Sequence, residues 1–212
     1  MTGIAFIGGE GPGVMRCKEL AGGADLIAAA DSGLLLAERA CITPDWIVGD
    51  MDSLDEQGGI SLLDKYPKDR VLIYPCDKDL TDTEIALNLL WEKGCDKTII
   101  AGGGGGRIDH IFALRSLFER ERTPDLWVTA GEAVYKLDAK VNCKKEFFTE
   151  KNTVVSVYPV GASPCKAESY GLKWSLNGIA WTMGAAGISN IALEERWTIN
   201  VVSGSFLIVV NF

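Results

Sequence analysis

Histidine is nearly absent from this sequence, with one in 212 residues, and its six cysteines include no CxxC pair. The chain therefore lacks the usual ligands of a zinc site, and we expect reduced, mostly buried thiols in a cytoplasmic protein. No apolar run reaches membrane-spanning length and the first residues show no signal-peptide pattern, so we expect no membrane partner. Positive charge is also scarce: 21 Lys and Arg face 29 Asp and Glu, which argues against a nucleic-acid partner.

Two familiar nucleotide-binding motifs are missing as well. The glycine run at 102–106 is not followed by Lys and Ser or Thr, as a Walker A loop requires, and the dinucleotide fingerprint with its acidic ribose ligand is not satisfied. Glycines before a helix still let the backbone approach an anion, and Arg107 adds a forked donor suited to phosphate. The glycine-rich segment 8–13 fits either a tight turn or a phosphate contact.

Hydrophobic residues make up 47% of the chain, which indicates a globular protein with a sizeable core. Up to about residue 130, strand segments alternate with helical patterns, and this alternation predicts a mainly parallel sheet with helices on both faces. The expected strands are 3–7, 26–30, 44–48, 71–74, 98–101 and 125–129. The sequence therefore predicts an α/β fold for this part of the chain.

The pattern changes after about residue 131, where strand segments follow one another without a long helical stripe. The expected strands are 135–137, 153–158, 171–176, 196–202 and 206–210. Ser203-Gly204 lies between two β-branched runs and predicts a hairpin. We therefore expect an α/β domain at 1–135, followed by an all-β domain at 136–212.

The segment 77–84, with the sequence DKDLTDTE, links a short strand to a helix and is the most informative part of the chain. Thr81 and Glu84 fit a capping box, which predicts that the helix begins near Thr81. Capping alone is one explanation for acidic residues at a helix N-terminus. The density of acidic residues around Lys78 favours the other explanation, a site that holds Mg²⁺ and phosphate.

Charged residues also follow the other predicted strands of the first domain. These are Asp31 after the second strand, Asp50 and Asp52 after the third, Asp79 and Asp82 after the fourth, and Arg107 and Asp109 after the fifth. Ligands of open parallel sheets bind at the carboxyl ends of the strands. Asp50 and Asp52 are two residues apart, so in an extended segment their side chains would face one point, which is costly unless a cation lies between them.

Other candidate groups carry less information. His110 lies just inside a predicted helix, and we expect a structural, partly buried residue that orients the turn at Asp109. The serines have no general base near them, so nucleophilic hydrolysis is poorly supported. Most of the six tryptophans are expected in the core, although one can offer a stacking surface to a flat cationic ligand.

Several of these segments together resemble the motifs of thiamin pyrophosphokinases in order and spacing. They are Asp31-Ser32-Gly33, Gly49-Asp50-Met51-Asp52-Ser53, Asp77-Lys78-Asp79-Leu80-Thr81-Asp82 and Gly105-Gly106-Arg107-Ile108-Asp109-His110. The C-terminal segments Gly171-Leu172-Lys173-Trp174, Ser189-Asn190 and Ser203-Gly204 resemble that family's thiamin-binding domain. Ser32 and Met51 depart from the family, which often has Gly and Phe there.

The resemblance implies transfer of a diphosphate group from ATP to the hydroxyethyl group of thiamin, with Mg²⁺ as cofactor and AMP as product. It also implies a β-sandwich for the second domain and a homodimer with sites at the subunit interface. On this interpretation Asp50, Asp52 and Asp79 hold Mg²⁺, and Asp82 or Asp109 positions or deprotonates the thiamin hydroxyl. The expected substrate-binding residues are Asp31, Lys78, Thr81, Gly105, Gly106, Arg107, Ser189 and Asn190.

Two alternatives remain open. The first is another diphosphokinase on the same nucleotide domain, acting on a pterin alcohol; the appended β domain with Ser189 and Asn190 argues against it. The second is a non-catalytic Mg-nucleotide sensor whose β domain binds a partner. The presence of all the acidic motifs argues against this second alternative.

Overall fold

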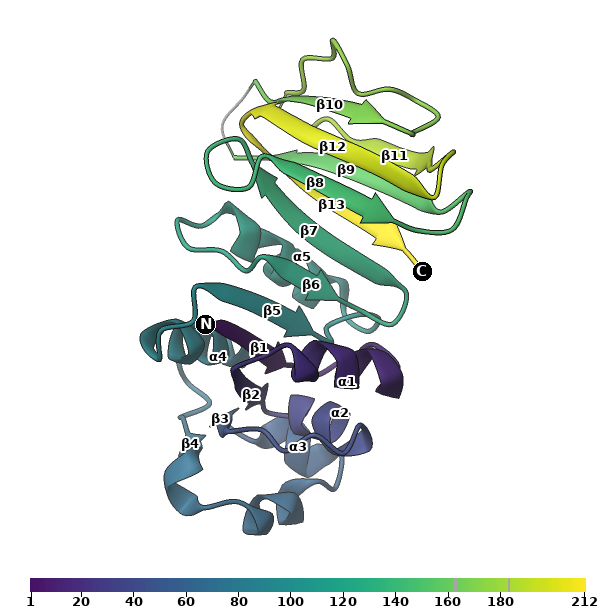
Figure 1. Ribbon diagram of the computed structural model, residues 1–212. Coiled ribbons are helices and arrows are strands. Elements are labelled where there is room, and N and C mark those ends of the chain that lie inside the picture. The colour runs from purple at the N-terminus through teal and green to yellow at the C-terminus, as the bar shows by residue number, and fades with distance from the viewer. Residues whose placement is uncertain (162–163, 183) are drawn as a thin grey trace. The chain divides into compact units, whose positions relative to one another are not determined.

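The computed structural model describes residues 1–161, 164–182 and 184–212, and the chain divides into two compact units (Figure 1). The first unit comprises Met1–Leu117 and Arg122–Ala130, and the second comprises Phe118–Glu121 and Gly131–Phe212. The boundary predicted after residue 135 falls within strand β7, in the second unit.

The first unit contains a parallel sheet with the strand order β6-β5-β1-β2-β3-β4. Its strands are β1 (Thr2–Phe6), β2 (Leu26–Ala30), β3 (Trp46–Gly49), β4 (Val71–Ile73), β5 (Lys97–Ala101) and β6 (Leu126–Val128). The helices are α1 (Val14–Gly22), α2 (Gly33–Arg39), α3 (Asp52–Glu56), α4 (Asp82–Glu92) and α5 (Ile108–Ser116), with short 3₁₀ segments η1 (Ile60–Lys65), η2 (Lys68–Arg70) and η3 (Leu117–Glu119). The predicted α/β fold is confirmed.

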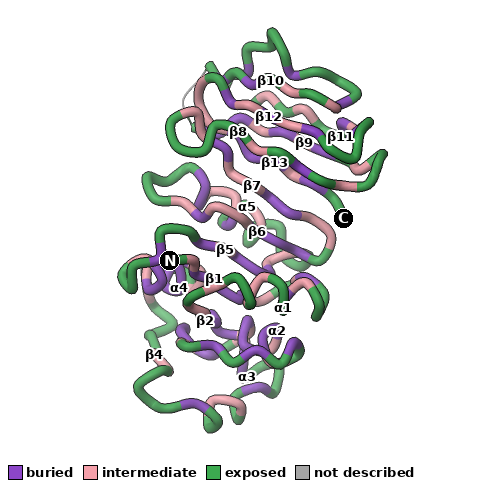
Figure 2. The backbone as a smooth tube through the Cα atoms, viewed as in Figure 1, coloured by how far each residue is buried: buried purple, intermediate pink, exposed green. Residues whose placement is uncertain are grey.

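Helices cover both faces of this sheet, and the alternation of side chains along β1 shows how. Ile4 and Phe6 point to one face, where they share a core cluster with residues of α1 and α2. Gly3 faces the other way: a Cβ atom there would lie 3.0 Å from Leu90 of α4 and 2.8 Å from Cys95. Figure 2 shows the central strands as buried, as expected for a parallel sheet covered on both sides.

The second unit is a β-sandwich. Its strands are β7 (Glu132–Asp138), β8 (Lys144–Phe148), β9 (Val154–Val160), β10 (Lys166–Tyr170), β11 (Gly187–Ile191), β12 (Arg196–Ser203) and β13 (Ser205–Asn211). They form two antiparallel sheets, β11-β9-β13-β7 and β10-β12-β8. Trp197 and Ile199 of β12 share a core cluster with Phe206 and Ile208 of β13, and Phe147 stacks on Trp197 with ring centroids 4.1 Å apart. The predicted all-β domain is confirmed.

Two local predictions in this unit are wrong. Ser203-Gly204 does not close a hairpin, because β12 pairs with β10 and β8 whereas β13 pairs with β7 and β9. The turn instead carries the chain from one sheet of the sandwich to the other, and Gly204 (φ +72°) packs against Cys165. The strand predicted at 171–176 is reduced to a single bridge between Leu172 and Ala192.

Cysteine exposure also differs from the expectation. Cys17, Cys95 and Cys165 are buried, while Cys41, Cys76 and Cys143 are exposed, and all six are free thiols. None of the described helices is long and apolar enough to cross a membrane.

Candidate active site

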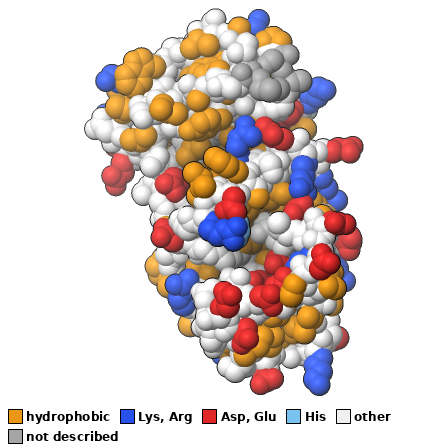
Figure 3. Space-filling view, turned by 180° about the vertical axis from the view of Figure 1, so that it is seen from behind, with side chains coloured by type: hydrophobic (Ala, Val, Ile, Leu, Met, Phe, Trp, Pro, Cys, Tyr) orange, Lys and Arg blue, Asp and Glu red, His pale blue; other side chains and the backbone are white. Residues whose placement is uncertain are grey.

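Three neighbouring strands of the first unit deliver carboxylates to the same edge of the sheet. Asp31 follows β2, Asp50 follows β3, and Asp82 opens α4 behind β4. One carboxylate oxygen from each of these residues lies within 4.8 Å of the others. We call Asp31, Asp50 and Asp82 the acidic cluster. Figure 3 shows acidic side chains gathered on the surface of this unit.

Unusual backbone conformations bring the cluster together. Gly49 has φ +140°, and a Cβ atom there would lie 3.1 Å from Asp82 Oδ1 and 3.2 Å from Asp31 Cβ, so a side chain would crowd the carboxylates. Asp31 adopts φ 48°, and its Oδ1 accepts a hydrogen bond from the Leu54 amide at 2.9 Å. This contact ties the end of β2 to the first turn of α3.

The segment between Asp50 and Asp52 is not extended, so that part of the prediction is wrong. Met51 is buried with a left-handed φ of 67°, and Asp52 already begins α3. The two acidic residues remain neighbours for another reason: the Asp52 amide lies 3.3 Å from Asp50 Oδ1, to which it donates a hydrogen bond. Asp50 therefore acts as the link between Asp52 and the acidic cluster.

Lys78 supplies the positive charge at this site. Its Nζ donates to Asp50 Oδ2 at 2.5 Å and lies 3.2 Å from Asp82 Oδ1, an ion-pair distance that lacks hydrogen-bond geometry. The Lys78 side chain is only 13% exposed, against 14% for Asp50 and 23% for Asp82. Three carboxylates and one ammonium leave two formal negative charges in a partly buried site.

The two aspartates that contact Lys78 are perturbed in opposite directions. The hydrogen bond from Lys78 holds the pKa of Asp50 below its ordinary value. Burial raises the pKa of Asp82, and the nearby Lys78 does not offset this cost. For Lys78 itself, burial alone would lower the pKa, but hydrogen bonding to Asp50 and attraction to Asp82 outweigh it and raise the pKa. Of these two aspartates, Asp82 is the one whose burial is not offset by Lys78.

The residues of the acidic cluster fit a divalent metal ion. Asp82 Oδ1 is buried and its one ion-pair partner among the described residues is the Lys78 ammonium at 3.2 Å, which it shares with Asp50. Carboxylate oxygens are the ligands that Mg²⁺ prefers, and Mg²⁺ commonly uses one or two of them alongside substrate phosphates. An ion bound here would balance the two negative charges that Lys78 leaves uncompensated.

Helix α4 is capped as predicted. The Thr81 hydroxyl accepts from the Glu84 amide, and Glu84 Oε2 accepts from the Thr81 amide at 2.9 Å. This capping box fixes the first turn of the helix, and Asp82 lies in that turn. The predicted substrate-binding residue Thr81 therefore has a structural part in positioning Asp82.

Asp52 and Asp79 lie outside the acidic cluster. Asp52 belongs to a second group of ligand atoms, with Asp50 and Cys76, in which the Cys76 thiol donates to Asp52 Oδ2 at 3.1 Å. That hydrogen bond raises the pKa of Cys76. Asp79 is exposed and is in neither group, so its metal role remains a prediction. Cys76 could not be recognised from the sequence, because a lone thiol carries no spacing pattern.

The two glycine-rich loops are bonded to each other. The Gly103 amide donates to Gly8 O at 2.8 Å, and Glu10 and Gly104 exchange two backbone hydrogen bonds of 2.7 and 2.9 Å. The backbone amides of Gly103 and Gly104 are therefore occupied by hydrogen bonds within the protein. Gly105 and Gly106 are exposed and have positive φ. Gly105 lies against the Glu10 carboxylate, whereas a Cβ atom at Gly106 would meet nothing within 4 Å, so Gly106 is the glycine of this pair that is open to an anion.

Arg107 and Asp109, which follow this loop, form a forked pair. Arg107 donates to both carboxylate oxygens, at 3.1 and 2.6 Å, and this contact lowers the pKa of Asp109. Both side chains are exposed, and β1 separates their strand, β5, from β2 in the sheet. His110 is exposed, so the expected partly buried histidine is wrong.

The predicted thiamin-binding pair in the second unit divides into one exposed and one buried residue. Ser189 is exposed with φ 59°, whereas the Asn190 side chain is buried. Asn190 Oδ1 accepts from the amides of Trp174 (3.0 Å) and Ile191 (2.8 Å), and Nδ2 donates to Trp174 O at 2.7 Å. Asn190 thus holds the backbone of Trp174, whose side chain is 53% exposed. Its amide keeps at most one N–H for a ligand.

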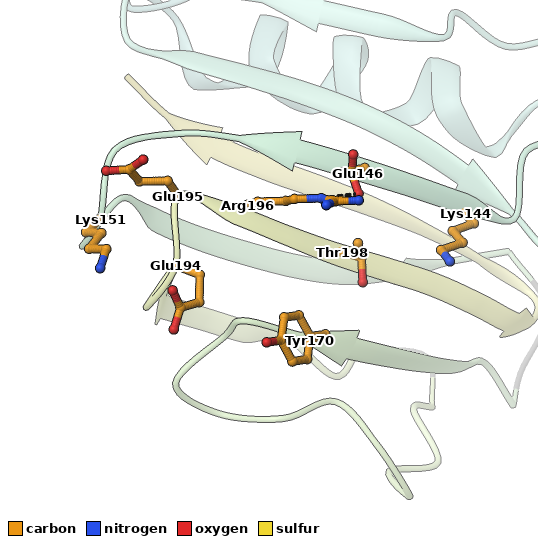
Figure 4. Close-up of a pocket in the computed structure, with 8 residues that line it drawn as sticks. All are labelled: Lys144, Glu146, Lys151, Tyr170, Glu194, Glu195, Arg196 and Thr198. Atoms are coloured by element: carbon orange, nitrogen blue, oxygen red, sulfur yellow. Dashed lines mark hydrogen bonds and ion pairs between the residues drawn. The ribbon is translucent and has the colours of Figure 1, made fainter.

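The second unit also has a pocket of about 630 Å³ on the outer face of the sheet β10-β12-β8 (Figure 4). Its lining residues are Lys144, Glu146, Lys151, Tyr170, Glu194, Glu195, Arg196 and Thr198. Across this face Arg196 pairs with Glu146 at 2.7 Å. None of the predicted site residues lines this pocket.

Comparison with known proteins agrees with the motif resemblance. The model of the thiamin pyrophosphokinase catalytic domain matches residues 17–128, and the model of the vitamin B1 binding domain of thiamin pyrophosphokinase matches residues 139–206. The chain belongs to the thiamin pyrophosphokinase family. This is a family of enzymes of the kinase class, and the first matched range contains the whole acidic cluster.

Individual relatives extend the match along the chain. The thiamine pyrophosphokinase of Bacillus subtilis (strain 168) is 25% identical over 184 residues, which cover 84% of each protein. The fold resembles the crystal structures of a B. subtilis thiamine pyrophosphokinase (TM-score 0.78, 23% identity, 100% of this chain and 99% of that chain) and of an Enterococcus faecalis family member (TM-score 0.78, 20% identity, 100% and 98%). At these identities the structures support the fold alone.

Proposed function

We propose that this member of the thiamin pyrophosphokinase family transfers a diphosphate group from ATP to the hydroxyethyl group of thiamin and releases AMP, with Mg²⁺ as cofactor. The observation that carries the proposal is the acidic cluster at the carboxyl ends of three adjacent parallel strands, in a chain that matches both family domains. Parallel α/β sheets bind their ligands at this edge.

The metal ion would neutralise charge on the phosphates, and the residues for it are Asp50, Asp82 and Asp31, with Asp52 beside them and Asp79 as a further predicted ligand. In this transfer the thiamin hydroxyl oxygen bonds to the β-phosphorus of ATP and loses its proton, while the bond from that phosphorus to the α-phosphate oxygen breaks and AMP leaves. Such a step depends on positioning and electrostatic stabilisation more than on covalent help from the protein. Lys78, Arg107 and the exposed amides at Gly105 and Gly106 are the phosphate-binding groups in this proposal.

We propose Asp82 or Asp109 as the group that positions the thiamin hydroxyl or accepts its proton. Burial raises the pKa of Asp82, which favours proton uptake by the metal-free carboxylate, while the Arg107 fork lowers the pKa of Asp109. A divalent ion on Asp82 would remove that advantage, because a nearby cation favours the charged carboxylate.

For thiamin we propose contacts with Ser189 and with the surface held by Asn190. Asn190 fixes the backbone of Trp174, whose half-exposed indole carries the Lys173 ammonium over its ring at 4.6 Å from the centroid. A flat cationic ligand that stacks on this indole would compete with Lys173. We also propose a homodimer in the cytoplasm, with sites at the subunit interface, on the basis of the family resemblance. Light scattering should then give about twice the chain mass of 22.9 kDa.

One assay separates this function from its alternatives. Purified protein is incubated with ATP, Mg²⁺ and either thiamin or a hydroxymethylpterin, and AMP is measured. We expect AMP in the reaction that contains thiamin and none in the reaction that contains the pterin. AMP only in the pterin reaction would assign the other diphosphokinase, and no AMP in either reaction would favour the nucleotide sensor. Asp50→Asn should abolish turnover, whereas Asp69→Asn, which removes an exposed carboxylate from η2, should leave it unchanged.

A further inference from the structure

The position of Lys78 in the acidic cluster has a consequence for metal binding. Its Nζ contacts Asp50 Oδ2 and Asp82 Oδ1. Asp50 and Asp82 are two of the three residues whose carboxylates could hold a divalent ion. An ammonium and a divalent ion that bridge the same two carboxylates would lie within a few ångströms of each other. Their repulsion in a partly buried site is strong. The two cations therefore compete.

We propose that Lys78 is a built-in cation that occupies the metal position of the nucleotide-free protein and leaves Asp50 when a divalent ion binds, which frees its ammonium to pair with a phosphate oxygen. This inference rests on the proposed function for the identity of the phosphate ligand. The exchange itself depends only on the acidic cluster and Lys78.

The chain around Lys78 permits this movement. Lys78 lies in the connection between β4 and α4, outside any helix or strand, and the neighbouring residues 75–77 and 79–81 are exposed. Its backbone amide makes a turn contact with Cys76 O at 3.2 Å. The side chain can therefore rotate away from Asp50 without breaking a regular element. The capping box holds Asp82 on α4, so the carboxylate stays in place as Lys78 leaves.

The charge balance favours replacement of the Lys78 ammonium by a divalent ion. With Lys78 in place, the acidic cluster keeps two formal negative charges and Asp82 Oδ1 has no hydrogen bond. A divalent ion satisfies Asp82 and neutralises more charge than the ammonium does. Without such an ion, the departure of Lys78 would leave three carboxylates in mutual repulsion. Lys78 thus stabilises the metal-free acidic cluster. Its ammonium also lies where it can pair with a phosphate of a metal-bound nucleotide.

The first test measures metal binding without catalysis. Binding of Mn²⁺ to nucleotide-free protein is followed by EPR of the free ion, for wild type, Lys78→Met and the control Lys68→Met. Lys68 is exposed on η2, so its removal changes net charge equally without touching the acidic cluster. We expect Lys78→Met to bind Mn²⁺ about tenfold to a hundredfold tighter, the range that corresponds to one charge-assisted hydrogen bond, and Lys68→Met to behave as wild type. Equal affinity in all three proteins overturns the proposal.

The second test follows Lys78 itself in the wild-type protein. Reductive methylation with formaldehyde, read by mass spectrometry, reports the exposure of each lysine amine. Methylation of Lys78 should be slow in metal-free buffer, severalfold faster with Mg²⁺, and slow again with Mg²⁺ and a non-hydrolysable ATP analogue, while Lys68 stays constant. NaCl at matched ionic strength should have no effect.

The two tests separate this inference from the proposed function. A Lys78 methylation rate that does not respond to Mg²⁺ in a protein that forms thiamin diphosphate overturns the exchange alone. A protein that shows the exchange but forms no thiamin diphosphate supports the role of Lys78 and overturns the proposed substrate.

Discussion

Replacement of Asn190 by alanine provides the sharpest test of how the second unit is organised. The side chain is 5% exposed, and both of its amide atoms bond to backbone. The family resemblance implies that Asn190 contacts substrate. The structure indicates a further role, in which Asn190 holds the segment of Trp174 beside β11.

The size of the effect follows from the groups left without partners. Asn190→Ala removes the acceptor for the Trp174 and Ile191 amides and the donor for Trp174 O. A buried polar group left unsatisfied costs about 1–3 kcal/mol, but water can reach part of the half-exposed Trp174. We therefore expect a loss of about 2–3 kcal/mol in the free energy of unfolding, or roughly 4–12 °C in Tm for a chain of this size.

The assay is urea or thermal unfolding, with Ser189→Ala as the matched control. Ser189 is the exposed neighbour, and its truncation should change stability by about 0.5 kcal/mol or less. Asn190→Asp keeps Oδ1 but places an oxygen against Trp174 O, so it should destabilise at least as much as alanine. If Asn190→Ala unfolds at the wild-type midpoint, the anchoring role is refuted and a purely substrate-contacting residue is favoured.

Three further predictions concern the first unit. Thr81→Ala removes the capping box of α4 and should cost about 1 kcal/mol in chemical unfolding, while Thr81→Ser should retain most of this stability; equal midpoints for all three proteins would contradict it. Asp82→Asn should raise the Tm of the metal-free protein, because burial raises the pKa of Asp82 and so disfavours its charged form; a lower Tm would show that the ion pair with Lys78 outweighs burial. The pKa of Glu38 is lowered by hydrogen bonds from Lys65 and Tyr66, so its stabilisation is present above the unfolded pKa and is lost as pH falls through the lower folded pKa. The stability gap between wild type and Glu38→Gln should therefore shrink as pH falls below the ordinary Glu pKa of about 4.3, and a gap independent of pH would refute it.

The sequence predicted the first unit more accurately than the second. Buried parallel strands such as β2 are continuous apolar runs, and β2 appears at its predicted bounds of 26–30. The missed strands β8, β10 and β11 are short and each has a single buried position, so they lack such a run. The false hairpin at 203–204 has a similar origin, because a turn between two sheets and a turn within one sheet use the same residue types.

The site was predictable in composition but not in detail. The strand-end rule correctly brought Asp31, Asp50 and Asp82 to one edge, since β2, β3 and β4 are neighbours in the sheet. The role of Lys78 between two carboxylates, and that of Asn190 as a backbone anchor, depend on side-chain directions that no local pattern encodes. The grouping of Asp52 with Cys76 likewise arises from tertiary contact between distant segments.

The backbone around the acidic cluster adopts conformations that bring like charges together. Met51 is a non-glycine residue with a left-handed φ, a conformation that costs on the order of 1 kcal/mol and persists only where the surroundings enforce it. Asp31 shares that conformation, and Gly49 has a φ that other residues rarely adopt. These three positions lie at the ends of β2 and β3, and their common effect is to bring like charges together, which opposes folding. Lys78 offsets part of this repulsion, because its ammonium pairs with both Asp50 and Asp82.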